Sequence, residues 1–586
     1  MSVHVRNQAV YQKNKGVLSV KPILSFRDFS FRYENQANPT IKNINLDIYP
    51  NEKVLILGPS GSGKSTLGRC MNGLIPNVFE GEISGEATIF GKEISAHSIT
   101  SLSEEVGTVL QDTSAQFVGL TVAEDVAFLL ENDVVQNHLM HEKVQEWSER
   151  MALAELLELS PQDLSGGQKQ RVSVSGVLIG EPDVLLFDEP LANLDPASGE
   201  KTIALIDTIQ KELEATIIII EHRLEDVLTQ SVDRVVILEK GEMVFNGKPE
   251  TLLKSDVLNK VGIRTPLYLS AMQYAGVDME RLNHIDNLHQ VDGVDVKEKV
   301  QDWHQMHMIE EQDITGKELM RLENVTFGYD RKRQILKDIS LTIHKGEMIS
   351  IVGTNGAGKT TLANIISAFL TPNKGKVFWE GQDITKDTIA QRAGRVGYVL
   401  QDPNQMISQH MIFDEVALGL RNRESDEAVI QKKVYQALKI CGLYPFREWP
   451  INALSYGQKK RVTIAAILVL EPEILILDEP TAGQDYRHYS EFMTFIRELN
   501  ESGMTILMIT HDMQLMLEYS NRTIVVNDGQ IIADVSPFAV LTSETLTKEA
   551  SLRLTSLYTL AKRMGIEDTN SFTRNFIHYE RTMLRE

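Results

Sequence analysis

Short runs of apolar residues recur along the chain, and each one ends in glycines or in charged residues. KVLIL (53–57) precedes a glycine-rich segment, VLLF (184–187) precedes Asp188, and TIIII (216–220) precedes Glu221. Unbroken apolar runs of this length are typical of parallel strands that are covered on both faces. The stretch TLGRCMNGL, which follows the first glycine-rich segment, can be helical. The pattern therefore predicts an α/β fold.

The same pattern occurs twice. GPSGSGKST (58–66) returns as GTNGAGKTT (353–361), VLLFDEP (184–190) as ILILDEP (474–480), and LSGGQKQRV (164–172) as LSYGQKKRV (454–462). The offset between matching residues is 295 at Lys64 and Lys359 and 290 at Asp188 and Asp478. So nearly constant an offset, over a period far too long for a solenoid, indicates a tandem duplication of one domain.

The repeat predicts four segments. These are a flexible N-terminus (1–22), a first domain with a C-terminal appendage (23–276), an acidic linker (277–317), and a second domain with its own appendage (318–586). Leucine spacing and the absence of internal proline predict helical appendages. His304 and His307 in the linker resemble metal ligands, but a solvated linker with one short helix is the favoured interpretation.

Composition narrows the class of protein. The formal net charge is −22, which disfavours a general binder of nucleic acid or of anionic membranes. The two cysteines, Cys70 and Cys441, lie in segments without metal-ligand spacing, so we expect a reducing cytosol and no disulfide framework. The N-terminus has no apolar signal segment, and no run of about 18 apolar residues could span a bilayer. Any membrane role then needs a partner.

GPSGSGKST fits the phosphate-loop pattern G-x-x-x-x-G-K-[ST], between a predicted strand and a predicted helix. Backbone N–H groups of such a loop curl around phosphates, helped by the helix N-terminus. Lys64 can reach the β- and γ-phosphates, and the Ser65 hydroxyl can bind Mg²⁺. Lys359 and Thr360 have these roles in the second copy. The predicted nucleotide-binding residues of the two loops are Gly58, Pro59, Ser60, Gly61, Ser62, Gly63, Lys64, Ser65 and Thr66, and Gly353, Thr354, Asn355, Gly356, Ala357, Gly358, Lys359, Thr360 and Thr361.

Two carboxylates follow each buried strand that carries the DEP sequence. Asp188 and Asp478 are placed to hold Mg²⁺, and Glu189 and Glu479 to polarise an attacking water. Alone, a DE pair is more often a solvated strand end. Its register with a phosphate loop, in both copies, favours the catalytic interpretation.

The ordered set of motifs closely resembles the ATP-binding cassette (ABC) ATPases, twice, from about residue 24 to 532. The set comprises the loop lysine, a glutamine after a strand, LSGGQ or LSYGQ, the DEP strand and a histidine after TIIIIE or TILMIT. The resemblance implies ATP and Mg²⁺ as cofactors and ATP hydrolysis as the activity. It implies two tandem P-loop nucleotide-binding domains, each with a β-subdomain, a helical subdomain and a small appendage.

The resemblance also implies roles for further residues. Tyr33 and Tyr329 would stack on adenine, and His222 and His511 would contact the γ-phosphate. Gln111 and Gln401 would touch Mg²⁺ and the attacking water, and Asp195 and Asp485 would cross between domains. Each ATP would lie between the phosphate loop of one domain and the signature sequence, LSGGQ or LSYGQ, of the other. The first loop would use Ser455 and Gly457, and the second loop Ser165 and Gly167. Because the serine and last glycine are retained around Tyr456, we expect both sites to hydrolyse ATP.

Within the family, CMNGLIPNVFEGEISGEATIFGKEI (70–94) and the segments after both glutamines look like energy-coupling factor (ECF) ATPases. That resemblance implies an importer of a vitamin, a vitamin precursor such as that of thiamine, or a metal cation. Its partners would be a transmembrane energising subunit and a substrate-binding membrane subunit, with this chain peripheral on the cytoplasmic face. A ribosome-associated twin cassette and the twin ATPase of a sugar importer are the alternatives. The acidic linker disfavours the former, and the intact motifs of both copies disfavour the latter.

Overall fold

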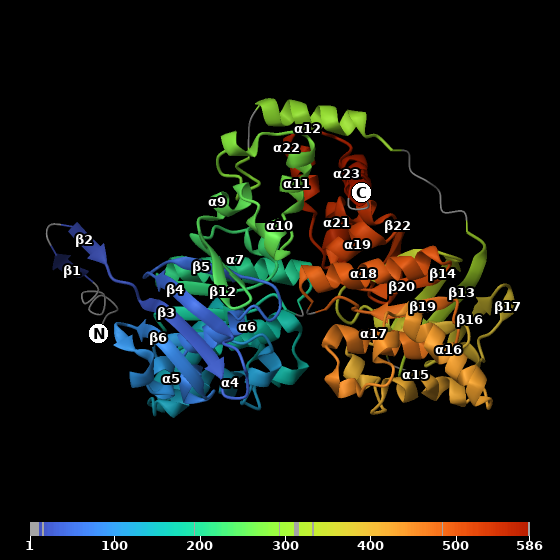
Figure 1. Ribbon diagram of the computed structural model, residues 1–586, viewed down its shortest axis with the longest axis horizontal. Helices are drawn as coiled ribbons and strands as arrows, with labels where there is room; N and C mark the ends of the chain where they lie inside the picture. Colours follow the sequence, from blue (N-terminus) through green and yellow to red (C-terminus); the bar gives the residue numbers. More distant parts are fainter. Residues whose placement is uncertain are drawn as a thin grey trace. The chain divides into compact units, whose positions relative to one another are not determined.

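The computed structural model describes residues 11–14, 17–192, 194–291, 294–309, 316–330, 333–482 and 484–583 (Figure 1). The chain divides into two compact units. The first comprises Met1–Leu194, Ser198–Gln273 and Asp278–Gly293, and the second comprises Asp195–Ala197, Tyr274–Val277 and Val294–Glu586.

A six-stranded sheet forms the centre of the first unit, in the order β12-β11-β5-β10-β9-β8. All neighbours pair in parallel except β12, which runs antiparallel to β11. The apolar runs of the sequence are its inner strands, and every residue of β5 and β10 is buried. The bounds are β5 Lys53–Leu57, β8 Val106–Val109, β9 Val184–Asp188, β10 Thr216–Ile220, β11 Arg234–Glu239 and β12 Glu242–Gly247.

A second, antiparallel sheet of the first unit has the order β4-β3-β6-β7, and β1 and β2 pair antiparallel in a separate two-stranded sheet. The bounds are β1 Tyr11–Asn14, β2 Val17–Val20, β3 Leu24–Tyr33, β4 Ile41–Ile48, β6 Gly81–Ile89 and β7 Lys92–Glu93. The helices of the first half of the chain are α1 Lys64–Met71, α2 Leu74–Asn77, α3 Ile99–Ser103, α4 Val122–Asn132, α5 Asn137–Arg150, α6 Gly166–Leu178, α7 Pro196–Leu213, α8 Leu224–Val227, α9 Pro249–Lys254, α10 Val257–Val261 and α11 Leu267–Tyr274, with short 3₁₀ turns η2 Ile94–Ala96, η3 Thr113–Gln116, η4 Ala154–Leu156, η5 Pro161–Asp163 and η6 Met279–Arg281.

The second unit repeats this architecture. Its central sheet has the order β18-β19-β20-β15-β21-β22, and its antiparallel sheet the order β14-β13-β16-β17. The strand bounds are β13 Glu318–Phe327, β14 Leu336–His344, β15 Met348–Val352, β16 Lys374–Trp379, β17 Gln382–Asp383, β18 Val396–Val399, β19 Ile474–Asp478, β20 Thr505–Ile509, β21 Arg522–Asn527 and β22 Gln530–Val535. The helices are α12 Val294–Met306, α13 Lys359–Ile366, α14 Ile389–Arg392, α15 Ile412–Arg421, α16 Glu427–Ile440, α17 Tyr456–Leu468, α18 Tyr486–Glu501, α19 Met513–Tyr519, α20 Pro537–Leu541, α21 Glu544–Glu549, α22 Ser556–Arg563 and α23 Thr569–Met583, with η7 Pro403–Gln405, η8 Tyr444–Phe446 and η9 Ile451–Ala453.

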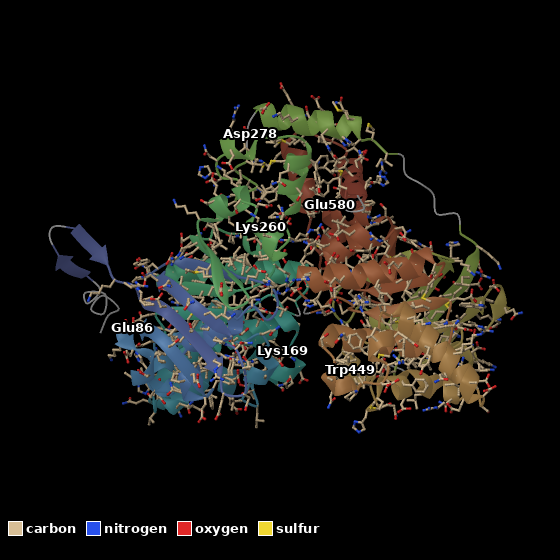
Figure 2. All side chains as sticks on the ribbon, viewed as in Figure 1. Glu86, Lys169, Lys260, Asp278, Trp449 and Glu580 are labelled. Atoms are coloured by element: carbon tan, nitrogen blue, oxygen red, sulfur yellow. The ribbon has the colours of Figure 1, made fainter. Side chains whose placement is uncertain are left out.

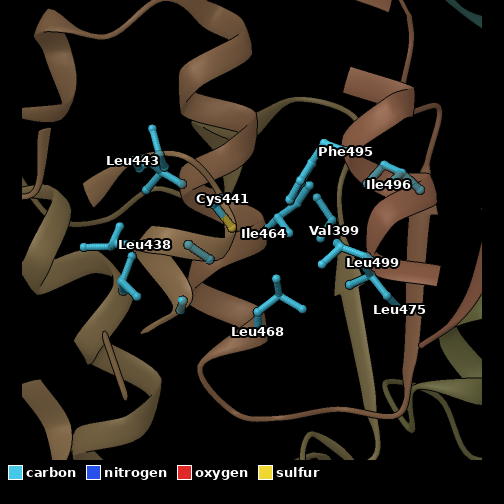
Figure 3. Close-up of a cluster of buried hydrophobic side chains, with 14 of the residues drawn as sticks. Val399, Leu438, Cys441, Leu443, Ile464, Leu468, Leu475, Phe495, Ile496 and Leu499 are labelled. Carbon is cyan, nitrogen blue, oxygen red and sulfur yellow. The ribbon is translucent and has the colours of Figure 1, made fainter. Parts of the chain in front are cut away.

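One apolar core of the second unit joins its sheet to its helical part. Figure 3 shows Val399 and Leu475 from the strands, Leu438 from α16, and Ile464 and Leu468 from α17 in this cluster. Strand β19 is apolar at every position before Asp478, so it can be covered on both faces. The signature helix α17 is thereby held rigidly against the sheet whose β19 ends in Asp478.

Part of the predicted linker is a structured element. Helix α12 buries Val296, Val300 and Trp303, and the Gln301 side chain donates a hydrogen bond to the Met564 carbonyl at 2.7 Å. The Trp303 ring stacks on His307 and meets Tyr579 of α23 edge to face. Residues 294–307 therefore pack on the C-terminal appendage of the second unit.

Candidate active site

Each phosphate loop closes around the ammonium group of its own lysine. Lys64 Nζ donates to the carbonyl oxygens of Gly58 and Pro59 at 2.7 and 3.0 Å. Lys359 Nζ does the same with Gly353 and Thr354, at 2.8 and 3.0 Å. These contacts hold the loop in a curl at the C-terminal end of β5 or β15, directly before helix α1 or α13.

Glycine is required at two points of each loop. Gly63 and Gly358 cap the following helices with φ of 101° and 106°, a left-handed conformation that other residues rarely adopt. A Cβ atom at Gly58 would overlap the Leu238 carbonyl oxygen, and one at Gly353 would overlap that of Val526. The loop sequence thus follows from the space between the loop and strands β11 and β21.

The aspartates at the ends of β9 and β19 are largely enclosed. Desolvation and the neighbouring Glu189 raise the pKa of Asp188 to about 6. In the second unit desolvation raises the pKa of Asp478, and it raises the pKa of Glu479 to about 8 with a further contribution from Asp478. A buried carboxylate pair of this kind favours a cation between the aspartate and a bound phosphate.

Glu189 and Glu479 occupy strained backbone. Their φ angles are 48° and 44°, in the left-handed region, and their N–H groups donate to the Ile220 and Ile509 carbonyls at 2.9 Å. Non-glycine residues in this region are concentrated at functional sites.

The glutamine and histidine side chains predicted for the site lie near carboxylates, but the contacts differ between the two copies. Gln111 Nε2 donates to Glu189 Oε2 at 2.8 Å. In the second unit His511 Nε2 lies 3.7 Å from Glu479 Oε1. Burial and the nearby Lys359 lower the pKa of His511 to about 4, so its ring is neutral at pH 7. His222 lies beside the wholly buried Glu221, at 3.6 Å.

The two predicted adenine-stacking tyrosines have different surroundings. The Tyr33 hydroxyl lies 3.2 Å from Thr66 Oγ1 and accepts a hydrogen bond from Arg69 at 3.0 Å. The Arg69 guanidinium stands 4.4 Å above the Phe79 ring. Tyr329 is 68% exposed and meets only Phe327 among the described rings.

The signature serines begin helices. Ser165 and Ser455 are the N-caps of α6 and α17, each in a capping box with the glutamine three residues on. Gly167 and Gly457 lie in the first turns of these helices. Tyr456, where the first copy has Gly166, donates a hydrogen bond to the Gln401 carbonyl at 3.3 Å.

Asp195 and Asp485 stand directly before helices α7 and α18. Asp485 caps α18 through the His488 N–H. Their neighbours Asn193 and Gly483 lie outside the described residues.

Four residues that touch these groups have no role in the sequence prediction: Arg69, Phe79, Glu221 and Tyr398. Tyr398 donates a hydrogen bond to Asp478, and Glu221 accepts one from the Leu191 N–H at 3.0 Å. Aligning the two halves pairs Tyr398 with Thr108 and Glu221 with Thr510, so each could have been flagged as a difference between the copies. His304 and His307, for which the sequence favoured a solvated linker over a metal site, make contacts within the protein: His307 Nδ1 lies 2.8 Å from the Trp303 carbonyl oxygen and His304 Nδ1 lies 3.2 Å from Asn575 Nδ2.

Two α/β domains define a twin P-loop nucleotide hydrolase. Each has a mostly parallel sheet, a phosphate loop, a strand-end carboxylate pair and an N-capped signature helix. The chain matches the family described as "ABC transporter" over residues 41–192 and 336–482. Residues 255–327 match a family described as "ATP-binding cassette cobalt transporter". The protein belongs to the ABC transporter ATP-binding family, and its two cassettes are ATPase domains.

Several relatives share the name "Putative ABC transporter ATP-binding protein". Those of Enterococcus faecalis and Lactobacillus johnsonii are 58% and 53% identical, and each alignment spans 96% of this chain and 99% or 98% of the relative. A solved structure described as cbiO1 of Clostridium perfringens, part of the ABC transporter complex cbiONQ, is 33% identical. It covers 42% of this chain and 99% of its own, with a TM-score of 0.38. The two family matches and the relatives of 58% and 53% identity confirm the predicted fold class and ATPase activity.

Proposed function

We propose that this chain is the energy-coupling ATPase of an ECF-type importer, which drives uptake of a vitamin, a vitamin precursor or a metal cation such as Co²⁺. The match of residues 255–327 to the cobalt-transporter family carries this proposal. That match covers part of the first appendage, the predicted linker and the first strand of the second cassette. It therefore bears on features outside the common ATPase core.

Exposed apolar side chains after Gln111 are the proposed docking surface for a transmembrane energising subunit. Leu120 is 83% exposed and Val118 is 63% exposed, directly before helix α4. The Asp125 carboxylate accepts hydrogen bonds from the Val118 and Gly119 N–H groups and fixes the loop. Exposed apolar side chains that are contiguous on the surface are typical of a protein contact, and Val118 and Leu120 are close neighbours in the loop.

The second cassette has a matching loop with a different surface. Glu415 accepts hydrogen bonds from the Ser408 and Gln409 N–H groups at 2.8 and 2.7 Å, as Asp125 does in the first cassette. Trp449, labelled in Figure 2, is 48% exposed, and its carbonyl accepts a hydrogen bond from the Ile412 N–H. No helix of the described residues is long and apolar enough to cross a membrane. The chain would act peripherally, on the cytoplasmic face, through such loops.

In the proposed mechanism the loop lysines bind the β- and γ-phosphates, and Glu189 and Glu479 accept a proton from the attacking water. Gln111 orients that water and the Glu189 carboxylate, because the Gln111 amide already donates a hydrogen bond to Glu189. A neutral His511 can donate a hydrogen bond to the γ-phosphate from the nitrogen that is protonated. Desolvation raises the pKa of Glu479, so this carboxylate is a stronger base than a solvated one.

The donor set at each strand end fits Mg²⁺. Asp188 Oδ1 is buried and has no hydrogen-bond partner among the described residues, so a cation would satisfy it. No group of three or more His, Cys, Asp or Glu side chains in the described chain could hold a metal ion. Mg²⁺ prefers one or two protein ligands with phosphates and water. Asp188 with Ser65 and Gln111, or Asp478 with Thr360 and Gln401, would hold the ion, which neutralises the phosphate charge when bound.

We further propose that each signature helix serves the phosphate loop of the other cassette. Ser455 and Gly457 would complete the first site, and Ser165 and Gly167 the second. The N-terminus of a capped helix is suited to bind an anion such as a γ-phosphate. The duplication supports this division, since each cassette carries both a loop and a signature.

Affinity capture from detergent-solubilised membranes tests the importer proposal. The tagged full-length chain is expected to retain a polytopic membrane protein, identified by mass spectrometry. Leu120→Asp should reduce its recovery at least fivefold, because the charge would be desolvated in the contact. Val134→Asp is the matched control, since Val134 is 87% exposed just beyond the other end of α4. Recovery of ribosomal proteins without any membrane protein would refute the proposal.

A further inference from the structure

The strand beside each aspartate strand differs between the cassettes. In the second cassette Tyr398 of β18 pairs with Ile476, two residues before Asp478. In the first, Thr108 of β8 pairs with Leu186, two residues before Asp188. Residues two apart on a strand share a face. Tyr398 and Thr108 therefore occupy equivalent positions, and only their side chains differ.

Tyr398 reaches the aspartate. Its hydroxyl donates a hydrogen bond to Asp478 Oδ2 at 2.8 Å, and the residue is only 7% exposed. The Phe369 ring lies 5.8 Å from the Tyr398 ring and limits its movement. A hydrogen bond to an ionised carboxylate is short and directional, so it fixes the orientation of the Asp478 oxygens.

In the first cassette the Thr108 side chain bonds elsewhere and not to Asp188. The Thr108 hydroxyl accepts a hydrogen bond from Asn72 Nδ2 at 3.3 Å. Asp188 Oδ1 remains buried without a hydrogen-bond partner in the part of the chain that the structure describes. The Asp188 carboxylate thus lacks the orienting contact that Asp478 has.

We propose that Tyr398 is a positioning residue for the second metal site, and that the two cassettes hold Mg²⁺ with unequal affinity. The inference rests on the proposed function, in which Asp188 and Asp478 hold Mg²⁺ with ATP. Residues that orient a metal-binding carboxylate typically contribute 10- to 100-fold to metal affinity. Of the two aspartates, only Asp478 receives a tyrosine hydrogen bond among the described contacts.

Mn²⁺ binding measures this directly and without turnover. The full-length protein is saturated with a non-hydrolysable ATP analogue and titrated with Mn²⁺, and free Mn²⁺ is followed by its electron paramagnetic resonance signal. Wild type is expected to give two dissociation constants. Tyr398→Phe, which keeps the ring, should raise one of them about tenfold. Tyr398→Thr, which copies the first cassette, should bring the two constants together.

Two further variants assign the change to a site. Asp478→Asn removes one Mn²⁺ site, and Tyr398→Phe should then leave the remaining constant unaltered. Thr108→Val is the matched control and should change neither constant, because Thr108 does not touch Asp188. Two Mn²⁺ constants that stay the same in Tyr398→Phe and Tyr398→Thr would overturn the inference while leaving the proposed function standing. Absence of nucleotide-dependent Mn²⁺ binding in wild type would overturn both.

Discussion

Lys460 lies within the signature helix of the second cassette, where the first has Gln170. Both side chains donate a hydrogen bond of 2.7 Å to the carbonyl oxygen of the proline that follows the proposed catalytic glutamate, Pro480 or Pro190. Lys460 is buried, and desolvation lowers its pKa to about 8 in spite of the nearby Glu479. The same structural link is thus made by a neutral amide in one copy and by a cation in the other.

Lys460→Gln should therefore change how stability depends on pH. An unfolded chain keeps the lysine proton up to about pH 10.4, whereas the folded chain loses it near pH 8. Between these values the unfolded state binds more protons, so wild-type stability rises with pH. Relative to wild type, the variant should be stabilised at pH 7, by at most about 3 kcal/mol, and this advantage should shrink by pH 9.5. Thermal unfolding midpoints at both pH values measure the difference.

The reciprocal variant, Gln170→Lys, serves as the matched control. It introduces a buried lysine at the equivalent position of α6, so it should destabilise the protein at pH 7 and do so less at pH 9.5. A difference between Lys460→Gln and wild type that is constant from pH 7 to 9.5 would contradict the explanation.

The positions of the candidate residues could be predicted where a motif fixes their spacing, and not where the direction of a side chain decides. The glycines of the phosphate loops, the strand-end carboxylates and the signature serines all lie where the sequence places them along elements. Tyr398 and Thr108 differ visibly between VGYVLQD and VGTVLQD. That Tyr398 reaches Asp478 depends on strand register and rotamer, which no local pattern encodes.

At the level of elements, the repeat predicted both cores well because parallel strands read as unbroken apolar runs. The segment after the first appendage was harder. Helix α12 carries only a few apolar positions among charged ones, and their partners in α23 lie some 270 residues away. A sparse pattern of this kind reads as a solvated linker until the surface that covers Trp303 is known.

Trp303→Ala should loosen the packing of α12 on α23. Trp303 is 5% exposed and lies against His307, Phe572 and Tyr579. Removing a buried tryptophan costs about 3–5 kcal/mol where the surroundings cannot collapse. Amide hydrogen exchange should rise in residues 294–306 and 569–583, with little change in the sheet strands. Met306→Ala, at a position that is 78% exposed, is the control, and equal exchange in both variants would count against the packing role.

For the whole molecule, the proposed division of labour between cassettes predicts which substitutions act on the same site. Glu189→Gln and Glu479→Gln should each lower ATPase activity substantially, and together by about 100-fold or more, because a general base contributes at least that factor. Ser455→Ala should add little to Glu189→Gln, since both would affect the first site. Ser165→Ala with Glu189→Gln should affect both sites, and steady-state phosphate release measures the single variants and all three double variants.

The opposite pairing would overturn the division. If Ser165→Ala added nothing to Glu189→Gln while Ser455→Ala did, each signature would serve its own loop. Full activity in either single glutamate variant would remove that glutamate from the mechanism. Glu86→Gln, at an exposed position of β6, is the control for a change of charge.

Because the two cassettes belong to one chain, each cassette is always accompanied by the other and never by a second copy of itself within that chain. If the two cassettes were separate chains able to pair freely, a cell would contain like and unlike pairs in proportions set by expression. Here every molecule carries one Thr108 and one Tyr398, one Gln170 and one Lys460. Each half can accumulate substitutions that would be harmful if two copies of it met. Because one chain carries both halves, they are always made in equal amounts, and the differences between them are inherited together.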